Sequence, residues 1–219
     1  MPDPLLPGRF LFRFAAPCLY RPRLDADEAA RLDERHRLPA LSALEGRTEF
    51  AEVRAAWNET GVAFSIRLTG KKQPPWCRAN RPEDSDGLQL WLDTRDVHNV
   101  HRASRYCHRF IVLPSGGGSR FDEPFGQLLA INRAREQPHP VDPRQLGVRA
   151  AAQRGGYRLA VFVPAAALTG YDPAEHPRLG FTYVVLDREL GEQTFGVGSP
   201  LPYQEDPSLW ATLDLVRAS

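Results

Sequence analysis

The stretch from Asp84 to Pro114 carries most of the side chains suited to recognising a small polar molecule. Its alternation predicts a strand with one leucine face and one polar or flat face, the latter made of Gln89, Trp91 and Asp93. A loop rich in basic side chains follows, with Arg95, His98, His101, Arg102, Arg105, His108 and Arg109. Such groups on a stiff sheet suit ligand recognition. No recognisable nucleophile, base and acid motif accompanies them, so binding is favoured over catalysis.

The histidines and the cysteine of this loop raise the alternative of a metal site. Zinc needs three or four converging ligands. His98 and His101 could meet on one helical turn, but Cys107 and His108 point to opposite sides if they begin a strand. We therefore expect no metal and no cofactor, and histidines that tie the loop to its neighbours. A metal-binding protein or metal-dependent enzyme that uses the His98–His108 loop is kept as an alternative.

The arginines of the loop admit two interpretations. They have acidic neighbours in the sequence that would neutralise them in local ion pairs, namely Glu83, Asp84, Asp93 and Asp96. One or two of them could instead converge as bidentate donors on a carboxylate, a phosphate or sugar hydroxyls. An acidic sugar would satisfy both the rings and the guanidinium groups.

Composition narrows the class of protein. The chain has 219 residues and a net charge of +1, which argues against nucleic acid or an anionic membrane surface as a partner. Cys18, Cys77 and Cys107 form no motif and are expected to be reduced. Arg9 and Arg13 interrupt the apolar N-terminal residues, so no signal peptide is visible and we expect a cytoplasmic location. The oligomeric state is left open.

Period-two alternation recurs from about residue 48 onward, broken by turns that are rich in Gly and Pro. Strands are expected near residues 10–14, 51–57, 62–69, 86–93, 110–113, 128–132, 146–150, 157–163, 179–187 and 209–215. One helical turn is expected at 164–168, and a charged, helical piece at 25–37. Many short strands with one or two short helices predict an all-β fold, an antiparallel β-sandwich, with a closed barrel as the alternative.

The order of these elements resembles the family-nine carbohydrate-binding modules. The segments that carry the resemblance are the WNETG turn, a Pro-rich loop with a tryptophan, an acidic strand that ends in aspartate, the PAAAL turn, LGFTYVVLD and SLWATLDL. The resemblance covers residues 48–216 and implies one β-sandwich domain over 1–219, of the broad DOMON-like fold. Residues 1–45 would add an N-terminal strand and a charged segment. It further implies sugar binding without catalysis.

The resemblance also assigns roles to particular residues. The family's acidic strand places Asp86, Gln89 and Asp93 in its binding positions, with Gln89 where glutamate is usual. Trp76 would be one of the rings that hold the sugar. Together with the basic loop, the expected ligand-binding set is Trp76, Gln89, Trp91, Asp93, Arg95, His101 and Arg105. The ligand would be a sugar or an acidic sugar, and a scaffold that docks another protein is the remaining alternative.

Overall fold

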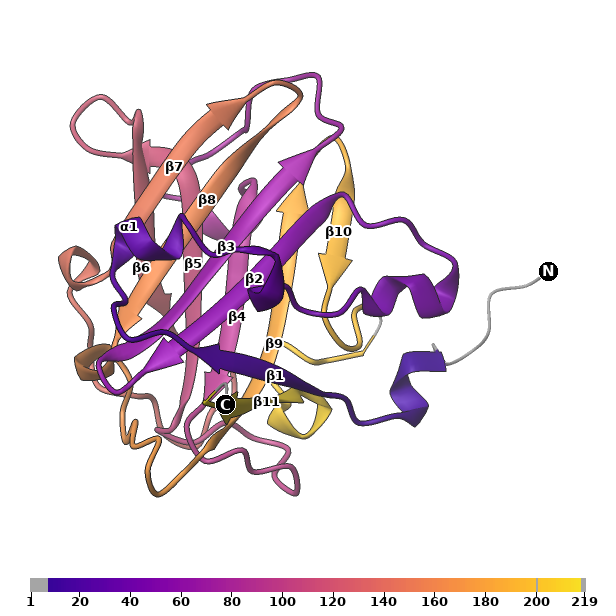
Figure 1. Cartoon of the computed structure of the whole chain (residues 1–219), viewed down its shortest axis with the longest axis vertical. Helices are drawn as coiled ribbons and strands as arrows, with labels where there is room; N and C mark the ends of the chain where they lie inside the picture. The colour runs from indigo at the N-terminus through magenta and orange to yellow at the C-terminus, as the bar shows by residue number, and fades with distance from the viewer. Residues whose placement is uncertain (1–7, 200, 218–219) are drawn as a thin grey trace.

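In the computed structural model, which describes residues 8–199 and 201–217, eleven strands form one mixed sheet (Figure 1). The strands are β1 (Ala15–Tyr20), β2 (Ala51–Asn58), β3 (Gly61–Thr69), β4 (Gly87–Asp93), β5 (Cys107–Gly117), β6 (Glu123–Leu129), β7 (Gly147–Gln153), β8 (Gly156–Pro164), β9 (Arg178–Asp187), β10 (Gly191–Thr194) and β11 (Ala211–Val216). The described helices are α1 (Ala26–Ala29) and the 3-10 helices Gly8–Leu11, Glu34–His36, Leu41–Glu45, Pro82–Asp84, Pro143–Gln145, Ala165–Ala167 and Pro207–Leu209.

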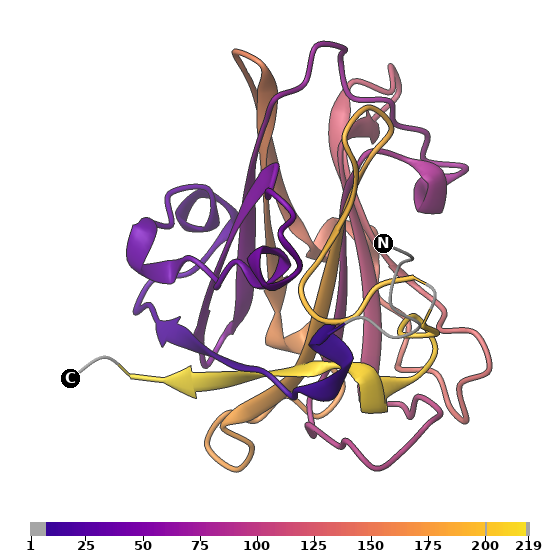
Figure 2. The same cartoon turned by 90° about the vertical axis from the view of Figure 1, so that its right-hand side faces the viewer.

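The sheet folds over into two layers. Its strand order is β6-β5-β4-β9-β11-β1-β2-β3-β8-β7, and β10 pairs with β9. Figure 2 shows the layers edge-on, with β11 running across one end from the layer of β4 and β9 to that of β2 and β3. At the other edge Gly126 of β6 lies against Val148 of β7, so the sheet nearly closes. The predicted all-β sandwich is confirmed, and both of its layers belong to one continuous sheet.

The space between the layers is filled by the alternating apolar side chains that the sequence predicted to point inward. Leu88, Leu90 and Leu92 of β4 are fully buried there. The rings of Phe64 on β3 and Phe181 on β9 stack across the gap with centroids 5.4 Å apart. Burial of apolar surface at roughly 25 cal/mol per Å² is the main force that holds the two layers together.

Several expected boundaries are wrong. The strand expected at residues 10–14 begins only at Ala15, because its partner β11 begins at Ala211, opposite Phe181. β1 pairs parallel with both β11 and β2, whereas only antiparallel pairing was expected. β5 continues through Pro114, where its register with β6 shifts between Leu113 and Gly117. A β-bulge of this kind tolerates a proline.

The remaining differences are smaller. The strand expected near 128–132 lies at Glu123–Leu129, and the last strand begins after the 3-10 helix Pro207–Leu209. The charged segment 25–37 is helical only at Ala26–Ala29 and Glu34–His36. The Asp25 side chain caps the first of these by accepting from the backbone N–H groups of Asp27 and Glu28.

Candidate functional site

β4 presents its polar side to the outside of the sandwich, but other segments cover that side. Gln89, Trp91 and Asp93 have 6%, 0% and 2% of their surface exposed. Trp91 belongs to a second, smaller apolar cluster on this outer face, together with Tyr203 and Trp210 from the segment before β11. The outward orientation follows from the alternation in the sequence, whereas much of the cover over Trp91 comes from Tyr203 and Trp210, more than a hundred positions away.

Arg109 joins Gln89 and Trp91 into one buried polar group. Its Nη2 donates to Gln89 Oε1 at 3.0 Å, and its guanidinium lies 5.2 Å from the centroid of the Trp91 ring. Its Nη1 donates to Glu83 Oε1 at 2.7 Å. The Trp91 Nε1–H donates to the carbonyl of Gln204 at 3.2 Å. Because Gln89, Trp91 and Arg109 are buried, a sugar reaches them only if residues 82–84 or 201–204 move.

Asp93 and Arg95, at the end of β4, both form hydrogen bonds to backbone groups of the protein itself. The Asp93 carboxylate accepts from the backbone N–H groups of Arg95 and Val97 at 3.0 and 2.9 Å, and burial raises the pKa of this carboxyl. Arg95 Nη1 donates to the carbonyl of Gly170 at 2.6 Å, and its guanidinium lies 4.3 Å from the Tyr106 ring. Arg105 shares that ring and donates to Tyr106 Oη at 3.1 Å. Arg95 and Arg105 therefore meet at Tyr106.

His101 lies elsewhere, exposed at the rim of a groove of about 690 Å³. Its Nδ1 is 3.0 Å from Asp206 Oδ2 and 3.1 Å from the Ser208 hydroxyl. Phe10, Phe12 and other apolar side chains line much of the groove, and Arg9, Arg13 and His98 line it as well. This groove contains none of the other six expected residues.

Trp76 is the one of the four tryptophans that is partly exposed, since Trp57, Trp91 and Trp210 are buried. Its backbone N–H donates to Asp86 Oδ2 at 2.9 Å, and its carbonyl accepts from the Asp86 N–H at 2.8 Å. The guanidinium groups of Arg78 and Arg188, both exposed, lie 4.7 and 4.4 Å from the ring centroid. Such cation–π contacts hold the ring at the surface.

A buried ion cluster stands behind Trp76. Lys71 Nζ lies 2.9 Å from Asp86 Oδ2 and 2.8 Å from Asp187 Oδ2, and all three side chains are at most 3% exposed. Burial opposes the ammonium charge, but the hydrogen bonds to Asp187 and Asp86 outweigh it and raise the pKa of Lys71. Asp86 ends the turn before β4, and Asp187 ends β9. The strands β4 and β9 are paired neighbours in the sheet. The cluster thus fixes the loop that carries Trp76.

The expected ligand-binding residues are therefore divided among four places. Gln89 and Trp91 meet at Arg109, Arg95 and Arg105 meet at Tyr106, and Asp93 lies beside the Arg95 backbone, while His101 and Trp76 lie apart from both groups. Sequence reasoning missed Arg78, Arg188, Lys71 and Asp187. Asp86, which the resemblance placed in a binding position, is instead buried against Lys71. The sequence shows that Arg188 directly follows the end of a predicted strand at Asp187. Its contact with the Trp76 ring, however, depends on the pairing of β4 with β9.

The histidines of the basic loop have separate partners. His98 Nε2 lies 2.8 Å from Asp96 Oδ1, whereas His108 is fully buried and its Nε2 accepts from the Thr169 N–H at 2.8 Å. Within residues 8–199 and 201–217, no three His, Cys, Asp or Glu side chains are grouped as a metal ion would require. In the same residues no helix has the length and apolar character to cross a membrane.

Comparison with known proteins gives a structural relationship without a sequence relationship. No protein-family model matches the sequence, and no curated protein matches it. A family-nine carbohydrate-binding module from Caldicellulosiruptor kristjanssonii, solved with cellotriose, superposes with a TM-score of 0.61 at 13% identity, over 94% of this chain and 95% of that one. A structure with glucose gives 0.60 at 12% identity, over 94% and 97%. This chain therefore has the fold of the family-nine carbohydrate-binding modules.

Proposed function

We propose that this protein is a carbohydrate-binding module without catalytic activity, that its sugar site is centred on Trp76, and that it prefers sugars that carry a carboxylate. The fold supports the proposal because it is shared with a module solved with cellotriose and with glucose. The observation that carries it is Trp76, which is partly exposed and whose backbone is held by the buried Asp86 carboxylate, while the other three tryptophans are buried.

The chemistry around Trp76 accounts for the acidic preference. The C–H groups of a pyranose face pack on an indole ring, and planar donors bind its hydroxyls and carboxylate. Arg78 and Arg188 lie over the ring. Because both side chains are exposed, a sugar can replace one guanidinium on the ring, and the displaced arginine then pairs with the sugar carboxylate. The nearby Glu189 is occupied by the backbone N–H groups of Lys72 and Gln73.

Calorimetric titration with matched neutral and uronic-acid oligosaccharides tests the proposal. Trp76→Ala is expected to weaken every sugar about 10- to 100-fold, which corresponds to the roughly 1.5–3 kcal/mol of a buried large apolar side chain. Arg188→Gln should weaken the acidic sugars and leave the neutral ones nearly unchanged.

Phe12→Ala is the matched control, because Phe12 is an aromatic side chain, 66% exposed, in the His101 groove. It should bind every sugar as the wild type does. A loss of affinity in Phe12→Ala with normal binding in Trp76→Ala would move the site to that groove. No heat from any sugar, or release of reducing ends during incubation, would contradict the function itself.

A further inference from the structure

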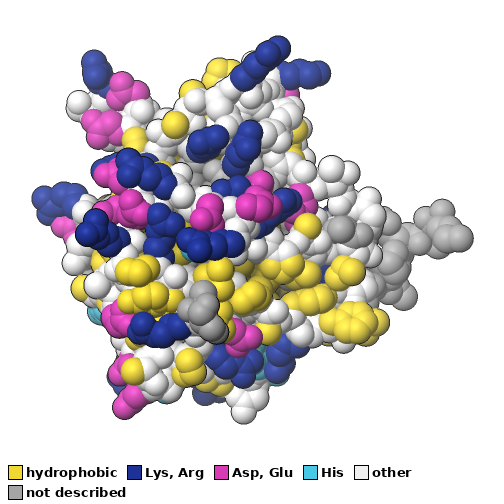
Figure 3. Space-filling view, in the orientation of Figure 1, with side chains coloured by type: hydrophobic (Ala, Val, Ile, Leu, Met, Phe, Trp, Pro, Cys, Tyr) yellow, Lys and Arg dark blue, Asp and Glu magenta, His cyan; other side chains and the backbone are white. Residues whose placement is uncertain are grey.

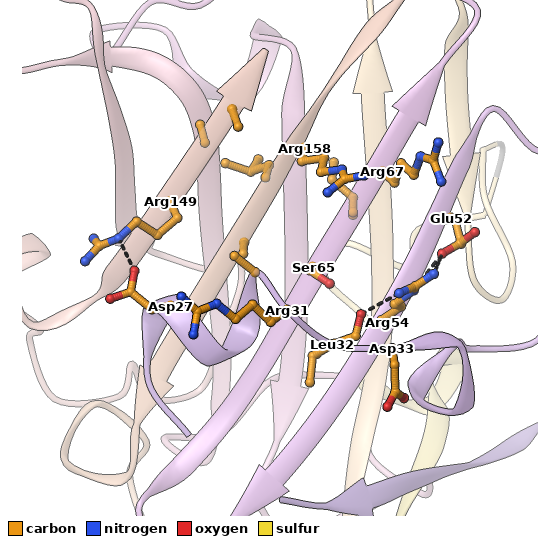
Figure 4. Close-up of a pocket in the computed structure, with 16 residues that line it drawn as sticks. Asp27, Arg31, Leu32, Asp33, Glu52, Arg54, Ser65, Arg67, Arg149 and Arg158 are labelled. Atoms are coloured by element: carbon orange, nitrogen blue, oxygen red, sulfur yellow. Dashed lines mark hydrogen bonds and ion pairs between the residues drawn. The ribbon is translucent and has the colours of Figure 1, made fainter. Parts of the chain in front are cut away.

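A second hollow lies on the outer side of one layer, and neither Trp76 nor its contacts Arg78, Asp86 and Arg188 line it. It is a groove of about 630 Å³ on the outer face of β2, β3, β8 and β7, beside the segment from Asp27 to Asp33 (Figure 4). We call it the arginine groove, because Arg31, Arg54, Arg67, Arg149 and Arg158 all line it, with Asp27, Asp33 and Glu52. Figure 3 shows basic and acidic side chains gathered across this face.

The strand register explains the shape of the groove. Ser65 and Ala160 lie directly opposite each other on β3 and β8. Because their side chains are small, they form the bottom of the groove. One row further along the same face, Arg67 and Arg158 are also directly opposite. α1 and the residues after it pack on the neighbouring apolar row, where Ala29 and Leu32 cover Ala56 and Ala63. The groove is thus bounded by this segment on one side and by the arginine pair on the other.

Three of the five arginines already have acidic partners. Arg149 Nε lies 2.7 Å from Asp27 Oδ1, and Arg31 lies 3.5 Å from Glu28. Arg54 pairs with Glu52 and Glu34 and donates to the carbonyl of Leu32. Asp33, the last acidic residue of the lining, pairs with His36 and Arg35. The carboxylates of the groove are therefore committed to other cations.

Arg67 and Arg158 are different. Both are exposed, and neither forms an ion pair with a described carboxylate. Arg158 donates its Nε to Gln153 Oε1 at 3.2 Å, which leaves both terminal nitrogens available. Like charges directly opposite on adjacent strands are destabilising. Arg67 and Arg158 therefore cost stability on a face where the other arginines have acidic partners. Such a local cost is expected at a functional site.

We propose that the arginine groove binds a small molecule through a tetrahedral dianion, a phosphate or sulfate ester, held between Arg67 and Arg158. Two guanidinium forks supply bidentate donors to such a group. The Ser65 hydroxyl, which has no hydrogen-bond partner among the described residues, lies on the same face two positions from Arg67 and is a third donor. A volume of about 630 Å³ lies in the range of small-molecule sites, so the groove has room for the rest of an ester.

The lining argues for a small ligand and against a long polyanion. Asp27, Asp33 and Glu52 lie around the arginine pair, so an extended chain of phosphates would meet carboxylates as it left the groove. The net charge of the whole chain is only +1. General attraction to nucleic acid is therefore weak.

The test is a calorimetric titration of the full chain with inorganic phosphate, inorganic sulfate, glucose 6-phosphate, a sulfated glucose and glucuronic acid. The esters are expected to bind more tightly than the inorganic ions and glucuronic acid, and the phosphate and sulfate arms show which ester is preferred. Arg67→Gln and Arg158→Gln should each lower the affinity for the ester at least tenfold. Arg120→Gln is the matched control, because Arg120 is 85% exposed, lies outside the groove, and its replacement changes the net charge equally.

Thermal unfolding gives a second readout that a purely structural role would not produce. Without ligand, Arg67→Gln and Arg158→Gln should melt about 1–3 °C above the wild type, because the repulsion between the two arginines is removed. Added ester should raise the melting temperature of the wild type and of Arg120→Gln but not of the groove variants.

Several outcomes would overturn the proposal. With the sugar site removed by Trp76→Ala, they are no saturable binding of any ester, tighter binding of glucuronic acid than of the esters, or tighter binding of a short oligonucleotide titrated in the same way. An equal loss of affinity in Arg120→Gln would also overturn it. Trp76→Ala should bind the ester normally. Failure of the sugar site at Trp76 is thereby distinguished from failure of the arginine groove.

Discussion

Lys71→Met removes the cation of the buried ion cluster and leaves two carboxylates without it. Lys71 Nζ is within 3.0 Å of both Asp86 and Asp187, and the two carboxylates are completely buried. Breaking a buried ion pair by removing one partner costs about 3–5 kcal/mol, because an uncompensated charge stays in a poorly solvated place. Each carboxylate keeps backbone donors, Asp86 from Trp76 and Arg188, and Asp187 from Glu189 and Leu190. We therefore expect about 3–5 kcal/mol of lost stability, and a folded protein.

Urea unfolding at neutral pH measures this loss. With a slope of roughly 2–3 kcal/mol per M for a chain of this size, the midpoint should fall by about 1.5 M. Lys72→Met is the matched control, because Lys72 is the exposed neighbour, and it should leave the midpoint nearly unchanged. The double variant Lys71→Met with Asp187→Asn should recover part of the loss, since one buried charge is removed. Sugar affinity at Trp76 should also fall in Lys71→Met, because Asp86 holds the Trp76 backbone.

The pH dependence gives the reasoning a second check. Because the folded pKa of Lys71 is raised, its contribution is complete below the unfolded pKa of about 10.4 and is lost only as the pH rises through the folded value. The wild-type cluster should be indifferent to pH between 6 and 9. A loss below about 1 kcal/mol, or an equal effect of Lys72→Met, would refute this account.

Two further predictions concern a buried histidine of β5 and a glycine of β8 that lies very close to the neighbouring strand. Burial lowers the pKa of His108 from 6.5 to about 4, so the folded state binds fewer protons than the unfolded state between these values, and the wild type should lose about 3 kcal/mol as the pH falls from 6.5 to 4. His108→Gln keeps an acceptor for the Thr169 N–H and should lack that part of the slope in urea titrations, whereas an unchanged slope would show that His108 is not its source. Gly156→Ala would place its Cβ 2.0 Å from the Leu68 carbonyl oxygen in the neighbouring strand, so we expect about 3 kcal/mol of destabilisation or failure to fold. Gly8→Ala, whose Cβ would meet nothing within 4 Å, is the control, and equal stability of the two variants would contradict the steric argument.

Local alternation was enough to predict most of the strands, because each pleated residue turns its side chain to the opposite face. The leucines of β4 point inward as expected, and Gln89, Trp91 and Asp93 point outward. Local reasoning failed where a strand's length depends on its partner. β1 begins where β11 gives it a neighbour, and β5 passes Pro114 through a bulge against β6.

The candidate sites show the same division more sharply. The types of the candidate residues, the strands that carry them and the side of each strand on which they lie could be predicted locally, since these follow from neighbours within a few positions. Which of these residues meet depends on the folded arrangement of the whole chain. That arrangement covered Trp91 with residues 203–210, left part of Trp76 exposed, joined Lys71 to Asp187, and set Arg67 opposite Arg158. Exposure, ion pairing and register each depend on segments brought together by strand pairing across the chain, and no pattern within one strand records which segment will become its neighbour.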